Sequence, residues 1–437
     1  MEWWLALLII MGCLFILFAL GTPIAFSFLI VNIIGVLLFW GGPSGLSQLV
    51  LSIRGSIATF VVLPLILFML MGTVLFQSGM GILAIDAIDK WMGRLPGRLG
   101  LLAVGSGVLL ATLTGTSMAS GAILGKALTP EMEKRGYKKA MSLGPILGSG
   151  GLAVLIPPSG IAVLVAAIAE TSVADVLIGG IVPGLLMATF YALYIILRCW
   201  YQPSIAPPYD IARLPLHEKT VLFLKYILPL GAIIFLVTGI IFLGIATPSE
   251  AGASGALGSF ILALCYRKLN RQVIKKTFAQ ALSVSTMMLM IITGAVAFSQ
   301  ILSFSGATIG LTNTIGGLPI SPILIIISLQ VVLIFLGMFA GQVAMIMVIV
   351  PLFMPIIEAF GMSPVWFCLL IILNVEMSAT SPPYGLLLFV MKGVAPPDTK
   401  MSDLYRAAIP FLACDLIVMA LMIAFPNVVL YLPSLMH

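Results

Sequence analysis

The sequence predicts an all-α polytopic membrane protein built from two inverted-topology repeats. Of the 437 residues, 61% are hydrophobic and only 8% are charged, whereas a soluble domain carries roughly a quarter charged residues. Several apolar runs exceed the roughly 18–20 residues that are needed to cross a bilayer. In addition, landmarks of the first half recur at a fixed spacing in the second half.

The repeat is clearest at two pairs of adjacent prolines. Pro157-Pro158 and Pro382-Pro383 are 225 positions apart, and Thr22-Pro23 and Thr247-Pro248 show the same spacing. We therefore expect a first repeat over residues 1–212, a cytoplasmic linker over 213–225 and a second repeat over 226–437. Further pairs at this spacing are Pro130 with Pro355, Glu133 with Glu358, Gly136 with Gly361, and Gly160 with Gly385.

Each repeat is predicted to contain five spans and a re-entrant hairpin, with an amphipathic arm helix between the scaffold spans and the hairpin. The run from Trp3 to Leu20 is expected to stay as the first span, because it lacks the basic start of a signal peptide. In the first repeat we expect spans at 3–21, 23–40 and 57–78, an arm at 84–98, a hairpin with its tip at Gly115-Thr116-Ser117, a proline-broken span at 139–169 and a last span at 176–198. In the second we expect spans at 227–244, 249–266 and 281–303, a hairpin at 320–360 with its tip at Ala340-Gly341-Gln342, a broken span at 364–391 and a last span at 408–431.

The orientation follows from the positive charges. An odd number of crossings per repeat places the second repeat upside down relative to the first. With the N-terminus outside, nearly all of the 21 lysines and arginines fall on the cytoplasmic side and only Arg54 falls outside, as the positive-inside rule requires. Both termini are therefore predicted to be periplasmic. This is the inverted-repeat plan of secondary transporters.

The broken helices and hairpin tips are the candidate binding sites. Two adjacent prolines remove two backbone donors and interrupt a helix, and unpaired backbone groups at membrane depth are tolerated only beside protein or a water-filled cavity. Carbonyl oxygens at the break suit Na⁺, and the N–H groups of the next half-helix suit a carboxylate. The candidates in the first repeat are Gly115, Thr116, Ser117, Ser120, Ser149, Gly150, Gly151, Pro157, Pro158, Ser159 and Gly160. Those in the second are Gly341, Gln342, Asn374, Glu376, Ser378, Thr380, Ser381, Pro382, Pro383 and Gly385.

These residues also have plainer interpretations. The proline pairs could be packing kinks, single hydroxyls could bond the carbonyl four residues earlier, and the glycines could serve close helix packing. Glu376 is different, because a carboxylate inside an apolar span is costly. It could bind a cation, be protonated or pair with a positive charge.

Three segments resemble the large membrane subunit of tripartite ATP-independent periplasmic (TRAP) transporters. They are "LTGTSMASGAILGKALTPEMEKRGY", "GSGGLAVLIPPSGIAVLVA" and "NVEMSATSPPYGLLLFVMKGVAPPD", and "GIATPSEAGASGALG" is similar to the start of that family's second half. The family's usual "TPP-x-G" reads Ser381-Pro382-Pro383-Tyr384-Gly385 here, with Thr380 one place earlier. The resemblance covers nearly the whole chain.

The resemblance implies a sodium-coupled uptake carrier of the bacterial inner membrane that works by an elevator movement. The substrate would be a small carboxylate, such as a dicarboxylate, a keto acid or a sialic acid, delivered by a soluble periplasmic binding protein. A small membrane subunit with four spans would be the other protein partner, and membrane lipid would surround both. Sodium would be the coupling ion, held by backbone carbonyls and hydroxyls, and no other cofactor is expected.

Other function classes stay open or are disfavoured. A stand-alone divalent-anion/sodium symporter of similar hairpin architecture is the alternative function. A channel is less favoured, because there is no ring of charged residues. An enzyme is disfavoured, because two histidines and five scattered cysteines supply no metal cluster or nucleophile–base pair. The net charge of +6 reflects loop orientation, so no nucleic-acid partner is expected.

Overall fold

The computed structural model describes residues 2–92, 95–114, 117–207 and 215–436. Every regular element in these ranges is helical, which confirms the all-α prediction. Before the linker, the helices are α1 (Trp3–Ala19), α2 (Ile24–Phe39), α3 (Gly45–Ile57), α4 (Leu63–Gln77), α5 (Met80–Trp91), α6 (Arg98–Thr114), α7 (Ser117–Lys134), α8 (Lys139–Leu155), α9 (Gly160–Ile168), α10 (Val173–Gly179) and α11 (Ile181–Tyr201), with single turns η1 (Gly42–Ser44), η2 (Phe60–Val62) and η3 (Pro203–Ile205).

The remaining helices follow the linker. They are α12 (Leu216–Leu222), the π-helical turn η4 (Phe223–Ile227), α13 (Leu228–Phe242), α14 (Pro248–Cys265), α15 (Arg271–Phe304), α16 (Ala307–Gly316), α17 (Pro322–Ala340), α18 (Gln342–Ala359), α19 (Pro364–Thr380), α20 (Leu386–Val394), α21 (Met401–Ala424) and α22 (Asn427–Ser434). Helices α7 and α18 begin and end 225 positions apart, and so do α8 and α19. The helices thus recur in the register of the sequence landmarks.

Seven helices of the described residues are long and apolar enough to cross a membrane, or eight if the bent pair α8–α9 counts as one span. Helices α1 and α2 are also apolar, but at 17 and 16 residues they fall just short of the 18 residues required. The chain is therefore a multi-span membrane protein, as predicted.

Three predicted segments differ from the observed helices. The span expected at 57–78 is found as the turn η2 followed by α4, which together cover Phe60–Gln77, and Pro64 lies in the first turn of α4. The helix α3 before it was not predicted. The arm expected at 84–98 ends at Trp91, and Arg98 opens α6 after the left-handed Gly97 (φ +66°). The span expected at 281–303 begins earlier, at Arg271, where the Asn270 side chain accepts a hydrogen bond from the Val273 N–H.

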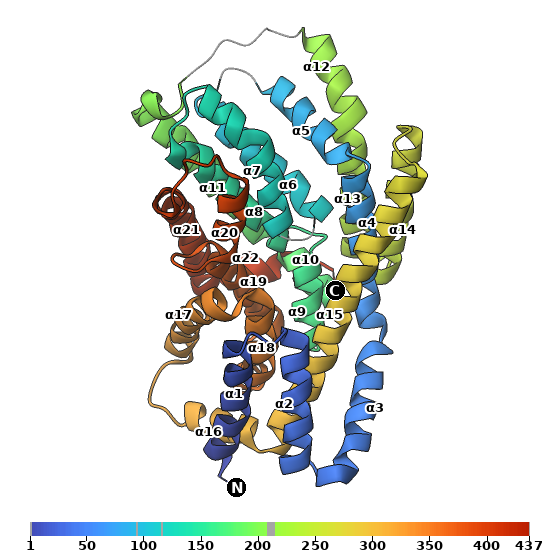
Figure 1. The fold of residues 1–437 in the computed structure, drawn as a ribbon, viewed down its shortest axis with the longest axis vertical. Coiled ribbons are helices and arrows are strands. Elements are labelled where there is room, and N and C mark those ends of the chain that lie inside the picture. The colour runs from blue at the N-terminus through green and yellow to red at the C-terminus, as the bar shows by residue number, and fades with distance from the viewer. Residues whose placement is uncertain (1, 93–94, 115–116, 208–214, 437) are drawn as a thin grey trace.

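The two hairpins lie towards opposite ends of the molecule. Figure 1 shows α6 and α7 in the upper part and α17 and α18 in the lower part. The cation-bearing α5, α12 and turn between α14 and α15 lie at the upper end, while α1 and α16 lie at the lower end (Figure 1). The segments with most lysines and arginines therefore gather at one end.

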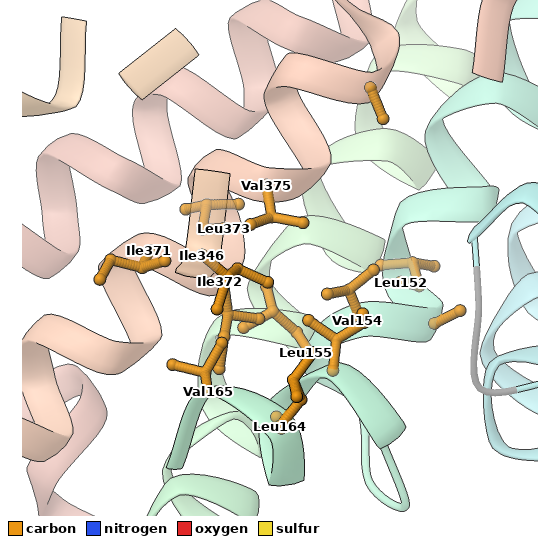
Figure 2. Packing of buried hydrophobic residues seen from close by; sticks show 14 of the residues in the cluster. Leu152, Val154, Leu155, Leu164, Val165, Ile346, Ile371, Ile372, Leu373 and Val375 are labelled. Atoms are coloured by element: carbon orange, nitrogen blue, oxygen red, sulfur yellow. The ribbon is translucent and has the colours of Figure 1, made fainter. Parts of the chain in front are cut away.

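The broken helices form the centre of the hydrophobic core. Leu152, Val154 and Leu155 of α8 approach side chains of α9, α18 and α19 (Figure 2). Residues 141–169 are all buried, as are 366–381. Because lipid is as apolar as these side chains, close van der Waals packing and not transfer from water holds the buried arms of both breaks in place.

Candidate functional site

The first break is closed by its own side chain. Helix α8 ends at Leu155, α9 begins at Gly160, and the two axes differ by 47° across a cis Pro157–Pro158 bond. The Ser159 hydroxyl donates to the Val154 carbonyl at 2.6 Å and accepts from the Ala162 N–H at 3.2 Å. One hydroxyl thus satisfies the end of one half-helix and the start of the next.

The second break is arranged differently. Helix α19 ends at Thr380 and α20 begins at Leu386, again across a cis Pro382–Pro383 bond. Both hydroxyls precede the prolines: Ser381 donates to the Met377 carbonyl at 2.6 Å, and Thr380 contacts the Glu376 and Met377 carbonyls at 3.2 Å. No side chain caps the N-terminus of α20, whose N-cap is Gly385. The Leu388 N–H donates to the Gly385 carbonyl at 3.0 Å, so the N–H groups that remain for a ligand are those of Leu386 and Leu387.

The second hairpin tip lies beside this break. Gly341 separates α17 from α18 and has φ +83°, a conformation that favours glycine. The neighbouring Gln342 side chain donates to the Val375 carbonyl of α19 at 3.1 Å. Helices α17 and α18 therefore meet at residues 340–342, and a side-chain hydrogen bond joins this junction to α19.

The first hairpin tip is only partly visible. Gly115 and Thr116 lie outside the described residues, while Ser117 opens α7. A Cβ atom placed on Gly150 would lie 3.2 Å from the Ser117 carbonyl oxygen. Ser117 and Ser120 are buried, and neither hydroxyl has a hydrogen-bond partner. These two oxygens are free to bind an ion.

The other predicted hydroxyls bond their own helices. Ser149 donates to the Ile146 carbonyl at 3.1 Å, and Ser378 donates to the Val375 carbonyl at 2.8 Å. This is the back-bonding expected of hydroxyls in membrane helices. It uses the proton of each hydroxyl and leaves oxygen lone pairs for a cation.

Asn374 anchors the second hairpin to its broken helix. Its amide nitrogen donates to the backbone and side-chain oxygens of Gln330 on α17, both at 2.8 Å. The equivalent position in the first half is Ser149, against which Gly107 of α6 packs with no room for a Cβ. The two polar positions at equivalent depth therefore have different surroundings.

Glu376 lies where the two halves meet. Its side chain is 1% exposed and neither carboxyl oxygen has a hydrogen-bond partner. A Cβ on Gly151 would lie 2.4 Å from the Glu376 Cγ, and Gly151 is the residue 225 positions earlier. The Ser117 hydroxyl lies close to this carboxyl, although the angles fall short of those of a hydrogen bond. The structure thus brings together Ser117, Gly150, Gly151 and Glu376.

Two buried polar residues were missed in the sequence analysis. Asp415 on α21 is 2% exposed, and the fully buried Tyr191 hydroxyl of α11 donates to its Oδ1 atom. Asp415 also acts electrostatically on Glu376. It could have been found by the rule that singled out Glu376, since it is an acid inside the apolar run "FLACDLIVMA". Nothing in the sequence pattern pairs it with Tyr191.

The hairpins and breaks also cross between the halves. Helix α7 of the first hairpin packs along α20, where Gly121 and Gly125 face Leu387 and Met391. Helix α18 of the second hairpin contacts α9. Each hairpin therefore lies against the first half-helix of its own half and the second half-helix of the other.

The two proline pairs differ in exposure. Pro157 and Pro158 are buried, and the adjacent Leu155 and Ile156 pack against glycines of the α10–α11 region. Pro382 is half-buried and Pro383 is exposed, with its carbonyl accepting a hydrogen bond from Tyr405 at 3.0 Å. The second break is the more accessible one.

Two cavities lie away from this site. One of about 600 Å³ and one of about 470 Å³ flank the turn between α9 and α10, and neither is lined by Ser117 or Glu376. The smaller cavity has a polar wall formed by Ser52, Ser56, Thr59, Glu170, Thr171 and Gln300.

Ion pairs tie the cation-rich end together. Arg98 at the start of α6 pairs with Asp89 of the arm helix α5 at 2.9 Å. Burial raises the pKa of Asp89, and the Arg98 guanidinium opposes this shift. Lys139 at the start of α8 lies 2.6 Å from Asp398 and 3.4 Å from Glu133. The arm, the first hairpin and the loop before α21 are thus linked.

The chain is similar to known transport proteins over almost its full length. A family model described as the DctM component of tripartite ATP-independent periplasmic transporters matches residues 11–428. The C4-dicarboxylate TRAP transporter large permease protein DctM of Pseudomonas aeruginosa is 29% identical, covering 91% of this chain and 92% of that protein. The ectoine TRAP transporter large permease protein TeaC of Halomonas elongata is 26% identical, covering 96% and 97%.

A solved structure has a similar fold. The YdaH transporter of Alcanivorax borkumensis, described as having an unusual topology, superposes with a TM-score of 0.61 at 16% identity, over 89% of each chain. At this identity the likeness concerns the fold alone. Together with the match of the family model, it is consistent with the helical membrane fold described above. The chain belongs to the DctM family: it is the large membrane subunit of a tripartite ATP-independent periplasmic transporter, and therefore a transport protein and not an enzyme.

Proposed function

We propose that this subunit carries a small organic acid into the cell by sodium symport, in a system that depends on a periplasmic binding protein. The observation that carries the proposal is the second break. There the uncapped N-terminus of α20 and the end of α19 lie beside the hairpin tip at Gly341, at the more accessible of the two breaks.

The anion would bind at the start of α20. Backbone N–H groups and the helix dipole at an N-terminus attract negative charge. The first half has no such vacancy, because Ser159 caps α9. Relatives are named for C4-dicarboxylate, 2,3-diketo-L-gulonate and isethionate, and each of these molecules carries an acidic group. We therefore assign the substrate class as small organic acids.

Sodium would bind to oxygen atoms near the breaks and tips. Hard cations prefer carbonyl, hydroxyl and carboxylate oxygens. The partnerless Ser117 and Ser120 hydroxyls and the oxygens of Ser378, Thr380 and Ser381 are suitable donors. Binding sodium together with the acid would lower the cost of placing a carboxylate at membrane depth.

Movement would follow from two inverted repeats. The recurrence of helices at 225 residues and the hairpins at opposite ends (Figure 1) support two halves of opposite orientation. The gathering of cations at the upper end supports a cytoplasmic assignment for that end, with both termini periplasmic. In this scheme the hairpins and broken helices slide as one unit along α1–α4 and α13–α15, an elevator movement.

Two protein partners complete the system. We assign a small four-span membrane subunit and a soluble periplasmic binding protein, in the bacterial inner membrane. The assignment of the small subunit is supported by the isethionate TRAP transporter permease protein DctMQ of Oleidesulfovibrio alaskensis, of which this chain covers only 58%. The rest of that protein is long enough to hold a small membrane subunit. Exposed apolar side chains such as Phe235, Leu236 and Leu257 on α13 and α14 offer a surface for that subunit and for lipid.

Transport in proteoliposomes tests this function. The three components are combined, and uptake of labelled succinate, 2,3-diketo-L-gulonate, isethionate and ectoine is measured under an inward sodium gradient. We expect uptake of at least one probe, abolished by replacing sodium with potassium or by omitting the binding protein. Uptake without the binding protein would instead support a stand-alone symporter, and currents far above carrier turnover would support a channel.

A further inference from the structure

A group of buried oxygens lies between the two halves without any balancing positive charge. Glu376 comes from α19 and Asp415 from α21, and both carboxyls are at most 2% exposed. The Ser117 hydroxyl comes from the first hairpin and is 1% exposed. Ser117 and Glu376 lie against consecutive glycines of α8, Gly150 and Gly151, and α21 packs on both α8 and α19.

The hydrogen-bonding capacity of this group is largely unused. Both oxygens of Glu376 and the Ser117 hydroxyl oxygen have no partner. Asp415 is held by the Tyr191 hydroxyl, which donates to its Oδ1 atom. Buried polar atoms normally have partners, and an unpaired one requires an explanation such as a bound ion.

Among the described residues, no lysine or arginine side chain balances the charge of these carboxyls. The helices that pack on α19 carry the charged residues Lys139, Asp175, Glu358, Lys392, Asp403 and Arg406, at or near helix ends. Among the charged groups of the described residues, only Asp415 acts on Glu376. A buried carboxylate without a partner is strongly unfavourable, and a bound cation would supply the missing partner.

We propose that Ser117, Glu376 and Asp415 form a cation site shared by the two halves, with Tyr191 as the residue that positions Asp415. This inference deepens the proposed function, because it assigns one coupling ion to a place that neither half supplies alone. We expect one such site and not a symmetric pair, because the residue equivalent to Glu376 in the first half is Gly151, which has no side chain and packs directly against Glu376.

The chemistry favours a monovalent ion. Calcium takes about six to eight oxygen ligands and magnesium requires a near-octahedral set. Within the described residues no group of three His, Cys, Asp or Glu side chains could hold a metal ion. We assign sodium because it is the coupling ion of the proposed function, and its single charge offsets one of the two carboxylates while a proton neutralises the other.

Direct binding of labelled sodium tests the site without substrate or binding protein. The purified complex of the large and small membrane subunits is placed in lipid nanodiscs, and ²²Na⁺ binding is measured at constant ionic strength with choline as the balancing ion. We expect Glu376→Gln and Asp415→Asn each to remove one bound sodium per complex. Ser117→Ala and Tyr191→Phe should weaken the same ion about tenfold, which corresponds to ~1.4 kcal/mol.

The matched control is Glu358→Gln, an exposed carboxylate on α18, which should bind sodium like the unmodified complex. Glu376→Asp keeps the charge with a shorter reach and should bind the ion more weakly without losing it. Sodium stoichiometry unchanged in both Glu376→Gln and Asp415→Asn would overturn the proposal. So would displacement of the ion by magnesium or calcium and not by lithium. Because no transport is measured, these outcomes are separate from any failure of organic-acid uptake.

Discussion

The two proline breaks occupy equivalent positions but differ in how the ends of their half-helices are capped. In the first, the hydroxyl follows the prolines, at Ser159, and closes both half-helices. In the second, the hydroxyls precede the prolines, at Thr380 and Ser381, and the next half-helix begins uncapped. The residue equivalent to Ser159 is the exposed Tyr384, whose ring contacts that of Phe339 in a tilted arrangement. The two breaks thus lie at equivalent positions, but a side chain closes the first while none caps the half-helix after the second.

The largest loss of stability is expected from a substitution at the contact between Gly151 and Glu376, where the two halves meet. Gly151→Ala would place a Cβ 2.4 Å from the Glu376 Cγ, inside a fully packed core. Overpacking of this kind destabilises by about 1–3 kcal/mol. We expect a clear drop in the thermal unfolding temperature in nanodiscs.

Gly105→Ala is the control for this substitution, because a Cβ there has nothing within 4 Å. It exchanges the same residue types in a neighbouring helix. Equal unfolding temperatures for the two variants would show that α8 and α19 are not packed as described at this point.

Ser159 should be the next most sensitive position. Ser159→Ala removes the cap of α9 and leaves the Val154 carbonyl without this donor. Loss of a serine cap costs about 0.5–2 kcal/mol, so the unfolding temperature should fall. The same measurement on Tyr384→Phe, at the equivalent position, should give little change. If both variants were equally stable, the two breaks would not differ in the way proposed.

Much of this fold could be predicted because proline and glycine act locally. Pro157, Pro158, Pro382 and Pro383 interrupt a helix whatever surrounds them, and Gly341 permits a left-handed turn. The recurrence at 225 residues then placed the remaining helices. Inclusion of Arg98 in the arm was wrong, because helix bounds depend on turns such as that at Gly97.

The site was less predictable, because it depends on packing between distant segments. Ser117, Gly151 and Glu376 were identified individually, but nothing in the spacing shows that they meet. The crossing of α7 onto α20 is likewise a tertiary feature. Asp415 was open to prediction from its apolar surroundings, whereas its partner Tyr191 was not.

Substitution of Ser381 should change the sodium affinity more than the stability of the fold. Its first-half equivalent is Ile156, which has no hydroxyl. If Ser381 supplies an oxygen to the ion, Ser381→Ala should raise the sodium concentration for half-maximal uptake about tenfold, or ~1.4 kcal/mol. Ser434→Ala, at the exposed end of α22, is the control. Unchanged sodium activation would remove Ser381 from the site; the parallel prediction for Thr116→Ala concerns a residue outside the described ranges.

The smallest effect is expected where the first broken helix is tied to the second half. Lys139 donates to Asp398 at 2.6 Å, and this hydrogen bond, before the effect of the lysine charge, lowers the pKa of Asp398. A carboxyl whose pKa is lower in the folded state stabilises the fold above its unfolded pKa of about 3.9, and this stabilisation is lost as pH falls through the folded value.

Asp398→Asn should therefore lower the unfolding temperature slightly at neutral pH, and the difference from the unmodified protein should vanish on acidification below about pH 4. The pair is exposed, so high salt should also reduce the difference. A difference that grew on acidification would reverse the sign of the linkage and exclude an ionised Asp398 as the partner of Lys139. This pair joins α8 to the loop after α20, so its loss would weaken the contact between the two halves. Because the residues of both breaks stay unchanged, this variant measures the contribution of that contact separately from the contribution of either break.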